Sequence, residues 1–153
     1  MKSVNQITAK EVLNSDPVTV SPDMNVSKIK NRMEENNLRA VPVVDGNNNL
    51  KGAVGYRDII RHLQFNPQNT KVDKVMHQPP NFEESDSLVD LADLRINSGR
   101  KMMVFEQGGK FAGKIDDTEF REALADAEET NDVHTRTIGS QEVLRVFEKD
   151  SIE

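Results

Sequence analysis

The chain contains an internal repeat, and this feature constrains its fold more than any other. Residues 40–63 align without a gap onto residues 101–124, at a constant shift of 61 residues that places Gly52 on Gly113. Both copies have an apolar β-rich run, a turn rich in Gly or Asn, a second apolar run and a helical period. Each copy therefore predicts a strand, a turn, a second strand and a helix.

The repeat extends upstream of these segments. Residues 12–17 (VLNSDP) resemble residues 75–80 (VMHQPP) at a shift of 63, so the second copy is two residues shorter in between. We expect a short strand in that interval of each copy, near residues 18–20 and 81–83. A helix should follow the short strand in both copies.

The expected helix starts carry capping residues. Asn25 is a suitable N-cap for the first copy, and Ser87 with Asp90 has the spacing of a capping box in the second. Thr8 and Glu11 have the same spacing ahead of a short N-terminal helix. The sequence thus predicts for each half an entry helix or turn, a short strand, a helix, two strands and a closing helix.

The predicted organisation has three parts. Residues 1–66 form the first repeat with its N-terminal cap helix, and residues 67–127 form the second repeat. Residues 128–153 form a C-terminal helical extension with a short apolar seam in SQEVLRVFEKD, or the start of a truncated further segment. We expect the two repeats to share one core.

Composition excludes several classes of protein. The 153 residues contain no cysteine, which excludes disulfides and thiolate metal sites. No apolar run reaches the roughly 20 residues of a membrane span, and the start lacks the apolar segment of a signal peptide. A formal charge of −6 argues against duplex DNA or an anionic membrane as the partner. We therefore expect a cytoplasmic protein.

Asp58 is the residue with the most chemical interest, and its position allows two interpretations. An acid in the first turn of a helix can simply complement the helix dipole, or it can face a cleft and bind a polar group. No nucleophile with a base, phosphate loop or dinucleotide fingerprint is present, so we expect no enzyme. His62, His77 and His134 are too far apart in sequence for a local metal site.

The order of these motifs resembles a known family. The segments DPVTVSPDMNVSKI and LRAVPVVDGNNNLKGAVGYRDII, with the frame from Gly52 to Asp58, resemble a tandem pair of cystathionine β-synthase (CBS) domains, or Bateman module. The resemblance implies an α/β (α+β) fold of two repeats related by a pseudo-twofold axis, each a small sheet packed against two helices. It also implies clefts for adenosyl compounds such as AMP, ADP, ATP or S-adenosylmethionine.

The family pattern suggests which residues bind such a ligand. Asp58 matches the acid that holds the ribose hydroxyls, whereas Gly55 stands where the family places Ser or Thr. The backbone ahead of Pro42 matches the segment that reads the adenine edge. The predicted ligand-binding residues are Thr19, Val20, Leu38, Arg39, Ala40, Val41, Pro42, Gly52, Gly55, Arg57 and Asp58.

The second copy departs from the pattern at four aligned positions. Pro42 becomes Met103, Gly55 becomes Asp116, Tyr56 becomes Asp117 and Asp58 becomes Glu119. We interpret Asp116 and Glu119 as a capping pair that serves the backbone. We also expect the three acids to repel phosphate unless Lys114 or a bound cation intervenes, so that this cleft stays empty or takes only a ligand without phosphates.

Two functions follow from the resemblance. The first is a regulatory module that senses an adenosyl ligand and acts on a partner protein. The alternative is a ligand-free scaffold for dimerisation or protein interaction, with degenerate clefts. A single-stranded nucleic-acid binder fits worst, because aromatic residues make up only 5% of the chain. Apolar positions on the helices, including Val26, Ile29 and Met33, together with the family habit, predict a homodimer.

Overall fold

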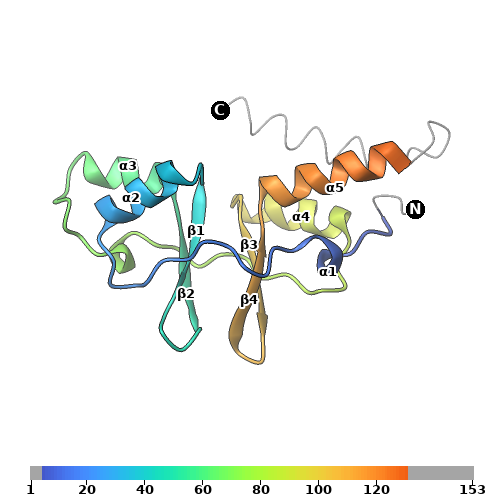
Figure 1. Ribbon diagram of the computed structural model, residues 1–153, viewed down its shortest axis with the longest axis horizontal. Coiled ribbons are helices and arrows are strands. Elements are labelled where there is room, and N and C mark those ends of the chain that lie inside the picture. The colour runs from blue at the N-terminus through green and yellow to red at the C-terminus, as the bar shows by residue number, and fades with distance from the viewer. Residues whose placement is uncertain (1–4, 131–153) are drawn as a thin grey trace. The chain divides into compact units, whose positions relative to one another are not determined.

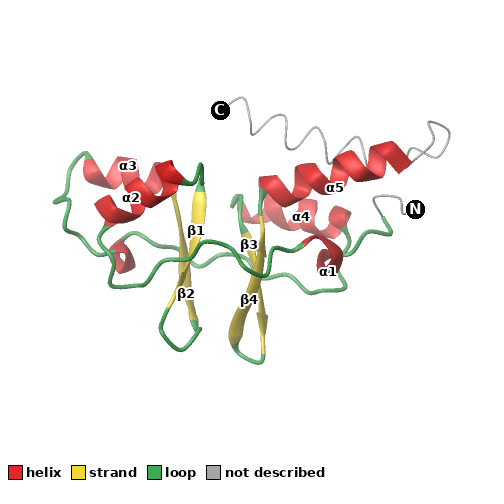
Figure 2. Cartoon of the chain, viewed as in Figure 1, coloured by secondary structure: helices red, strands yellow, loops and turns green. Residues whose placement is uncertain are grey.

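The structure is a computed structural model that describes residues 5–130. One short helix precedes two copies of a helix, strand, strand, helix unit (Figures 1 and 2). This arrangement confirms the predicted fold class. The elements are α1 (Ala9–Val12), α2 (Val26–Glu35), β1 (Ala40–Val44), β2 (Leu50–Gly55), α3 (Tyr56–Leu63), a 3-10 helix (Val72–Lys74), α4 (Leu88–Ser98), β3 (Met103–Gln107), β4 (Lys110–Ile115) and α5 (Asp117–Thr130).

Each sheet is a two-stranded antiparallel hairpin, β1 with β2 and β3 with β4. The short strands predicted near residues 18–20 and 81–83 are reduced to single parallel bridges. Val20 bridges Val43 in the first repeat, and Asn81 bridges Val104 in the second. Both members of the bridge shift by 61 residues between the copies, so the repeat is conserved in three dimensions as well as in sequence.

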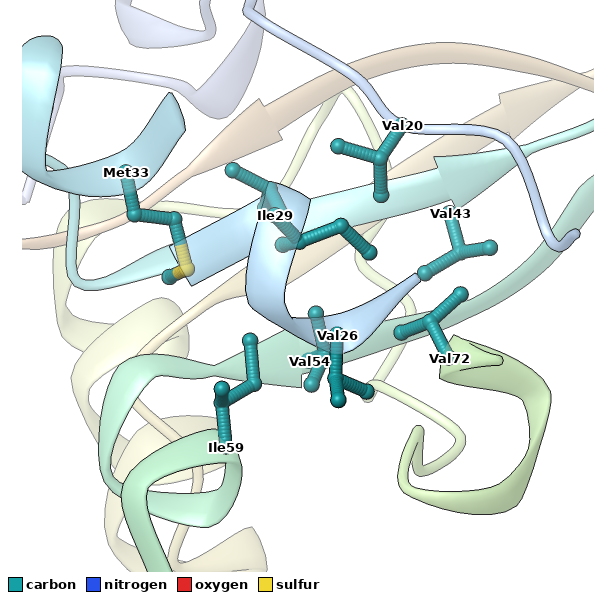
Figure 3. Packing of buried hydrophobic residues seen from close by; sticks show 9 residues of the cluster. Val20, Val26, Ile29, Met33, Val43, Val54, Ile59 and Val72 are labelled. Atoms are coloured by element: carbon teal, nitrogen blue, oxygen red, sulfur yellow. The ribbon is translucent and has the colours of Figure 1, made fainter. Parts of the chain in front are cut away.

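Helix α2 covers one face of the β1–β2 hairpin. Val26, Ile29 and Met33 of α2 have no exposed surface, and they pack against strand residues such as Val43 and Val54 (Figure 3). The helical spacing of these residues is therefore explained by the core of the first repeat. The homodimer stays a prediction, but these three side chains cannot supply its interface.

The three predicted N-cap positions are confirmed, but the Asn25 side chain makes no capping hydrogen bond. The Asp90 amide donates to the Ser87 hydroxyl at 3.1 Å, and the Ser87 amide donates to the Asp90 carboxylate at 3.0 Å, which completes a capping box. The Thr8 amide donates to the Glu11 carboxylate at 2.9 Å. Local sequence supplies the capping residues, and long-range backbone bonds such as that from the Ala9 amide to the Asp86 carbonyl at 2.7 Å also hold these helix starts.

The described chain divides into two compact units that do not coincide with the two halves of the sequence. The first-repeat unit consists of Asp16–Pro79 and Glu106–Ala112. The second-repeat unit consists of the remaining described residues, 5–15, 80–105 and 113–130. The boundaries predicted after residues 66 and 127 remain predictions.

Two connecting segments, each bonded to the sheet of the other repeat, account for much of this division; we call them the exchanged connectors. The segment around His77 lies in the first-repeat unit, where its backbone exchanges two hydrogen bonds of 2.8 Å with Ala53 of β2. The equivalent segment around Asn14 lies in the second-repeat unit and bonds in the same way to Lys114 of β4, at 2.9 and 3.0 Å. Each connector is thus paired with the sheet of the other repeat.

The aligned glycines Gly52 and Gly113 allow these connectors to approach. A Cβ atom on Gly52 would lie 2.9 Å from the His77 carbonyl oxygen, and one on Gly113 would lie 3.0 Å from the Asn14 carbonyl oxygen and 2.6 Å from the Leu13 side chain. None of these distances is compatible with an ordinary side-chain contact. The shared glycine of the repeat is therefore explained by backbone packing.

A contact between hairpin tips completes the first-repeat unit. Asn48, which adopts a positive φ of 64°, donates through its side chain to the Phe111 carbonyl at 2.9 Å and accepts from the Phe111 amide at 3.0 Å. Lys110 donates to the Asn49 side chain at 2.9 Å. The turn of the second hairpin is in this way held to the turn of the first.

Between residues 5 and 130, none of the helices is both long and apolar enough to cross a membrane. The predicted C-terminal seam and the alternative of a truncated further segment lie outside the described residues.

Candidate functional site

The first turn of α3 presents the candidate site. Gly55 is the N-cap of this helix, with an extended backbone, and the Tyr56 amide donates to the Arg39 carbonyl at 2.8 Å. This bond fixes the segment before β1 against the start of α3. Asp58 follows at the third helical position, in the first turn, where the helix dipole favours an anion.

The Asp58 carboxylate retains most of its hydrogen-bonding capacity. Its side chain is 32% exposed, and its one ionic contact within the described residues is to the exposed Arg61 guanidinium at 3.9 Å. A Cβ atom on Gly55 would lie 3.3 Å from an Asp58 carboxylate oxygen. The glycine therefore leaves open the space beside the carboxylate, and an ionised carboxylate there can accept several hydrogen bonds.

The other predicted ligand-binding residues differ in how far they are buried. Val20 and Val41 are core residues, and Pro42 is also buried. The Val20 amide and carbonyl are both used in the bridge to β1, which leaves this residue little to offer a ligand. The partly buried residues are Thr19, Leu38 and Ala40, and the exposed ones are Arg39 and Arg57.

The equivalent helix start in the second repeat is filled by a buried ionic cluster. The Lys114 ammonium, on a residue only 6% exposed, donates to Asp116 at 2.7 Å and to Glu119 at 2.8 Å. The Asp116 amide donates to the Glu119 carboxylate at 2.9 Å, and the Thr118 amide donates to the Asp116 carboxylate at 2.9 Å. The interpretation of Asp116 and Glu119 as a capping pair is confirmed.

The negative charge at this helix start is balanced by two cations. Lys114, the cation that the sequence left open as a partner, pairs with Asp116 and Glu119, and Arg95, which the sequence analysis missed, pairs with Asp117 at 2.6 Å. Two buried cations therefore offset most of the negative charge. Arg95 could have been found from the sequence, because it shares the buried stripe of α4 and a buried guanidinium needs a carboxylate partner.

Burial and pairing shift the titration of this cluster. Burial acts to lower the pKa of Lys114, but its hydrogen bonds and charge interactions with Asp116 and Glu119 outweigh burial and raise that pKa. Burial raises the pKa of Glu119, and the bond from Lys114 opposes this shift. Lys114 is therefore held as an ammonium ion.

Across residues 5–130, no group of three or more His, Asp or Glu side chains is placed to hold a metal ion. His62 and His77 lie in the described chain, whereas His134 lies outside it.

The comparisons with known proteins agree with the repeat and its fold. Residues 9–64 match the family model of the CBS domain. For these residues the predicted resemblance to a CBS domain is confirmed. Solved CBS-domain proteins share the fold of the chain, as is expected for a CBS pair. Among curated proteins, a 17.7 kDa protein of Acidianus ambivalens is 26% identical over 138 residues, 89% of this chain and 77% of that protein.

Solved CBS structures share the fold at low sequence identity. A Vibrio cholerae protein assigned to acetoin utilization (AcuB) gives a TM-score of 0.73 at 22% identity, covering 83% of this chain and 98% of that one. CBSX2 in complex with AMP gives 0.68 at 19% identity, covering 79% and 98%. The CBS pair of MJ0100, in complex with 5′-methylthioadenosine and S-adenosylmethionine, gives 0.67 at 14% identity, covering 78% and 97%.

Proposed function

We propose that this CBS pair is a regulatory module that binds an adenosyl compound at the first repeat, with Asp58 as the acceptor of the ribose hydroxyls. The observation that carries the proposal is the state of the Asp58 carboxylate, which is partly exposed and, among residues 5–130, has a 3.9 Å contact to Arg61 as its one ionic contact. Two hydroxyl groups on adjacent ribose carbons match the two oxygens of an ionised carboxylate. The adenosyl complexes of CBSX2 and MJ0100 support the ligand class.

The surroundings of Asp58 also suit a ligand with phosphates. The α3 N-terminus carries partial positive charge, and the exposed side chains of Arg39 and Arg57 belong to the two segments that meet there. AMP, ADP and ATP are therefore included in the proposed class beside S-adenosylmethionine. The role is regulatory, because nothing in the proposed site supplies a nucleophile with a positioned base.

A ligand-free scaffold is the second candidate function. It is favoured by the second repeat, where Lys114 bonds to both Asp116 and Glu119 and where the aligned acid, Glu119, is buried in that ion cluster. If the first repeat also failed to bind, the pair would act through protein contacts alone. The experiment below separates the two candidates.

The test is calorimetric titration of the full chain with AMP, adenosine, S-adenosylmethionine and 2′-deoxyadenosine. We expect one site per chain, weaker binding of the deoxy compound, and a loss of about tenfold to a hundredfold in affinity for Asp58→Ala. Asp90→Ala is the matched control, because Asp90 holds the same third position in α4 but serves its own capping box. It should lower the melting temperature and leave AMP affinity unchanged.

Two results would count against the proposal. Unchanged AMP affinity in Asp58→Ala, with a slightly lower melting temperature, would make Asp58 a helix-dipole residue only. An absence of binding by all four compounds to the folded wild-type chain would favour the scaffold.

A further inference from the structure

Three positions around the Asp58 carboxylate recur in the second repeat with larger side chains. The aligned pairs are Ala53 and Lys114, Gly55 and Asp116, and Asp58 and Glu119. In the first repeat the two β2 positions, Ala53 and Gly55, carry only a methyl group and a hydrogen atom. They therefore offer the Asp58 carboxylate of α3 no ionic partner. In the second repeat all three side chains are polar and bonded to one another.

From this comparison we infer that the Lys114 side chain is a built-in occupant of the second repeat's ligand position and limits the chain to one adenosyl ligand. The inference rests on the proposed function, since it assigns the ribose position by the equivalence of Glu119 with Asp58. Lys114 is in this sense a specificity-determining residue: it decides how many of the two repeats accept a ligand.

The geometry explains why a ligand does not displace Lys114. The ammonium lies 2.8 Å from Glu119 and 2.7 Å from Asp116, and both Lys114 and Glu119 are more than nine-tenths buried. A ribose that took over Glu119 would separate a buried cation from one of its two partners, and breaking a buried ion pair is strongly unfavourable. The neutral hydroxyls of the ribose would not compensate for the lost ion pair.

The second repeat therefore excludes an adenosyl ligand because Lys114 occupies the position, and not because unpaired acids repel the ligand. Because Lys114 and Arg95 offset the carboxylates, a ligand without phosphates is excluded as firmly as a nucleotide. Adenosine, which carries no charge, distinguishes the two causes. Repulsion would admit it to the second repeat, whereas occupation by Lys114 would not.

The mutational test uses the full chain and places the first-repeat side chains at the three aligned positions of the second repeat. It starts from Asp58→Ala, which lacks the first anchor, and adds Lys114→Ala, Asp116→Gly and Glu119→Asp. We expect adenosine and AMP to regain at least about tenfold in affinity over Asp58→Ala alone. The combined variant must keep a cooperative melting transition.

A folded combined variant that binds no more tightly than Asp58→Ala, while wild type binds one AMP, would overturn the inference and leave the proposed function standing. If wild type binds no adenosyl probe, the proposed function itself fails. Two adenosine sites in wild type would contradict the assignment of Lys114 as an occupant.

A second measurement needs no substitution. Acetylation of lysine amines in the wild-type chain, followed by mass spectrometry, should label Lys114 at least about tenfold more slowly than the exposed Lys28 of α2. Saturation with AMP should leave the labelling rate of Lys114 unchanged. Faster labelling of Lys114 when AMP is bound would mean that the nucleotide displaces it, and the inference would be wrong.

Discussion

Asp58, Asp90 and Glu119 all occupy the third position of their helices, yet their carboxylates have different tasks. Asp90 and Glu119 accept hydrogen bonds from the amide of their N-cap residues, at 3.0 and 2.9 Å. Asp58 follows a glycine N-cap, and the part of the chain that the structure describes gives it only the contact to Arg61. An acid at one helix position can thus be structural or available for a ligand, depending on its neighbours.

A prediction at the residue scale concerns Gly52. Replacement by alanine places a methyl group 2.9 Å from the His77 carbonyl oxygen, so either β2 or the connector around His77 must move. We expect Gly52→Ala to lower the free energy of unfolding by about 1–3 kcal/mol, measured by urea titration. Gly46→Ala is the control, since a Cβ atom there has nothing within 4 Å. Equal urea midpoints for the two variants would refute this account of Gly52.

The parts of the site that were predictable from sequence are those fixed by nearby residues. The helix starts, the Asp58 frame and the capping role of Asp116 and Glu119 follow from spacings of three to six residues. The pairing of Arg95 with Asp117 was missed because it joins residues 22 positions apart. The contact between the connector residue Asn14 and Lys114 of β4 joins residues 100 positions apart, so no local spacing in the sequence indicates it.

At the scale of one element, the turn between β1 and β2 is organised by Asp45. Its carboxylate accepts from the Asn47 and Asn49 amides at 2.9 Å each and lies 3.6 Å from the Lys51 ammonium. The hydrogen bond from the Asn49 backbone is the largest cause of a lowered pKa for Asp45. The same turn carries Asn48, which holds the tip of the second hairpin.

This turn predicts a dependence of stability on pH. Because the pKa of Asp45 is lower in the folded chain than the ordinary value of 3.8, its stabilising effect is present above that pH and is lost as the pH falls through the folded value. Wild type should therefore melt higher than Asp45→Asn near neutral pH, and the gap should close in acid. Asp93→Asn, at an exposed carboxylate of α4, controls for net charge. A gap that stays constant from neutral pH to well below 3.8 would be inconsistent with this role.

At the scale of the whole molecule, neither compact unit is a continuous piece of chain. The first-repeat unit draws residues 67–79 from beyond the predicted repeat boundary, including the buried Val72, whose amide donates to the Met24 carbonyl at 3.0 Å. It also draws the hairpin tip at Glu106–Ala112. The boundary of an independently stable piece is therefore expected to lie after residue 79.

Two fragments test this expectation. Residues 1–79 keep Val72 and the His77 bridge, whereas residues 1–66 lose both. We expect the longer fragment to show a cooperative thermal transition at a higher temperature than the shorter one, followed by circular dichroism. The full chain serves as the upper reference. Identical melting curves for the two fragments would instead support the boundary after residue 66.

The exchanged connectors also bear on how the two copies can change over time. A substitution near His77 acts on β2 of the first repeat, and one near Asn14 acts on β4 of the second. A substitution in either connector can therefore affect fitness by destabilising the sheet of the other copy. The two repeats can diverge at the proposed ligand positions, as at Ala53 and Lys114, but a change in a connector must stay compatible with the glycine that faces it.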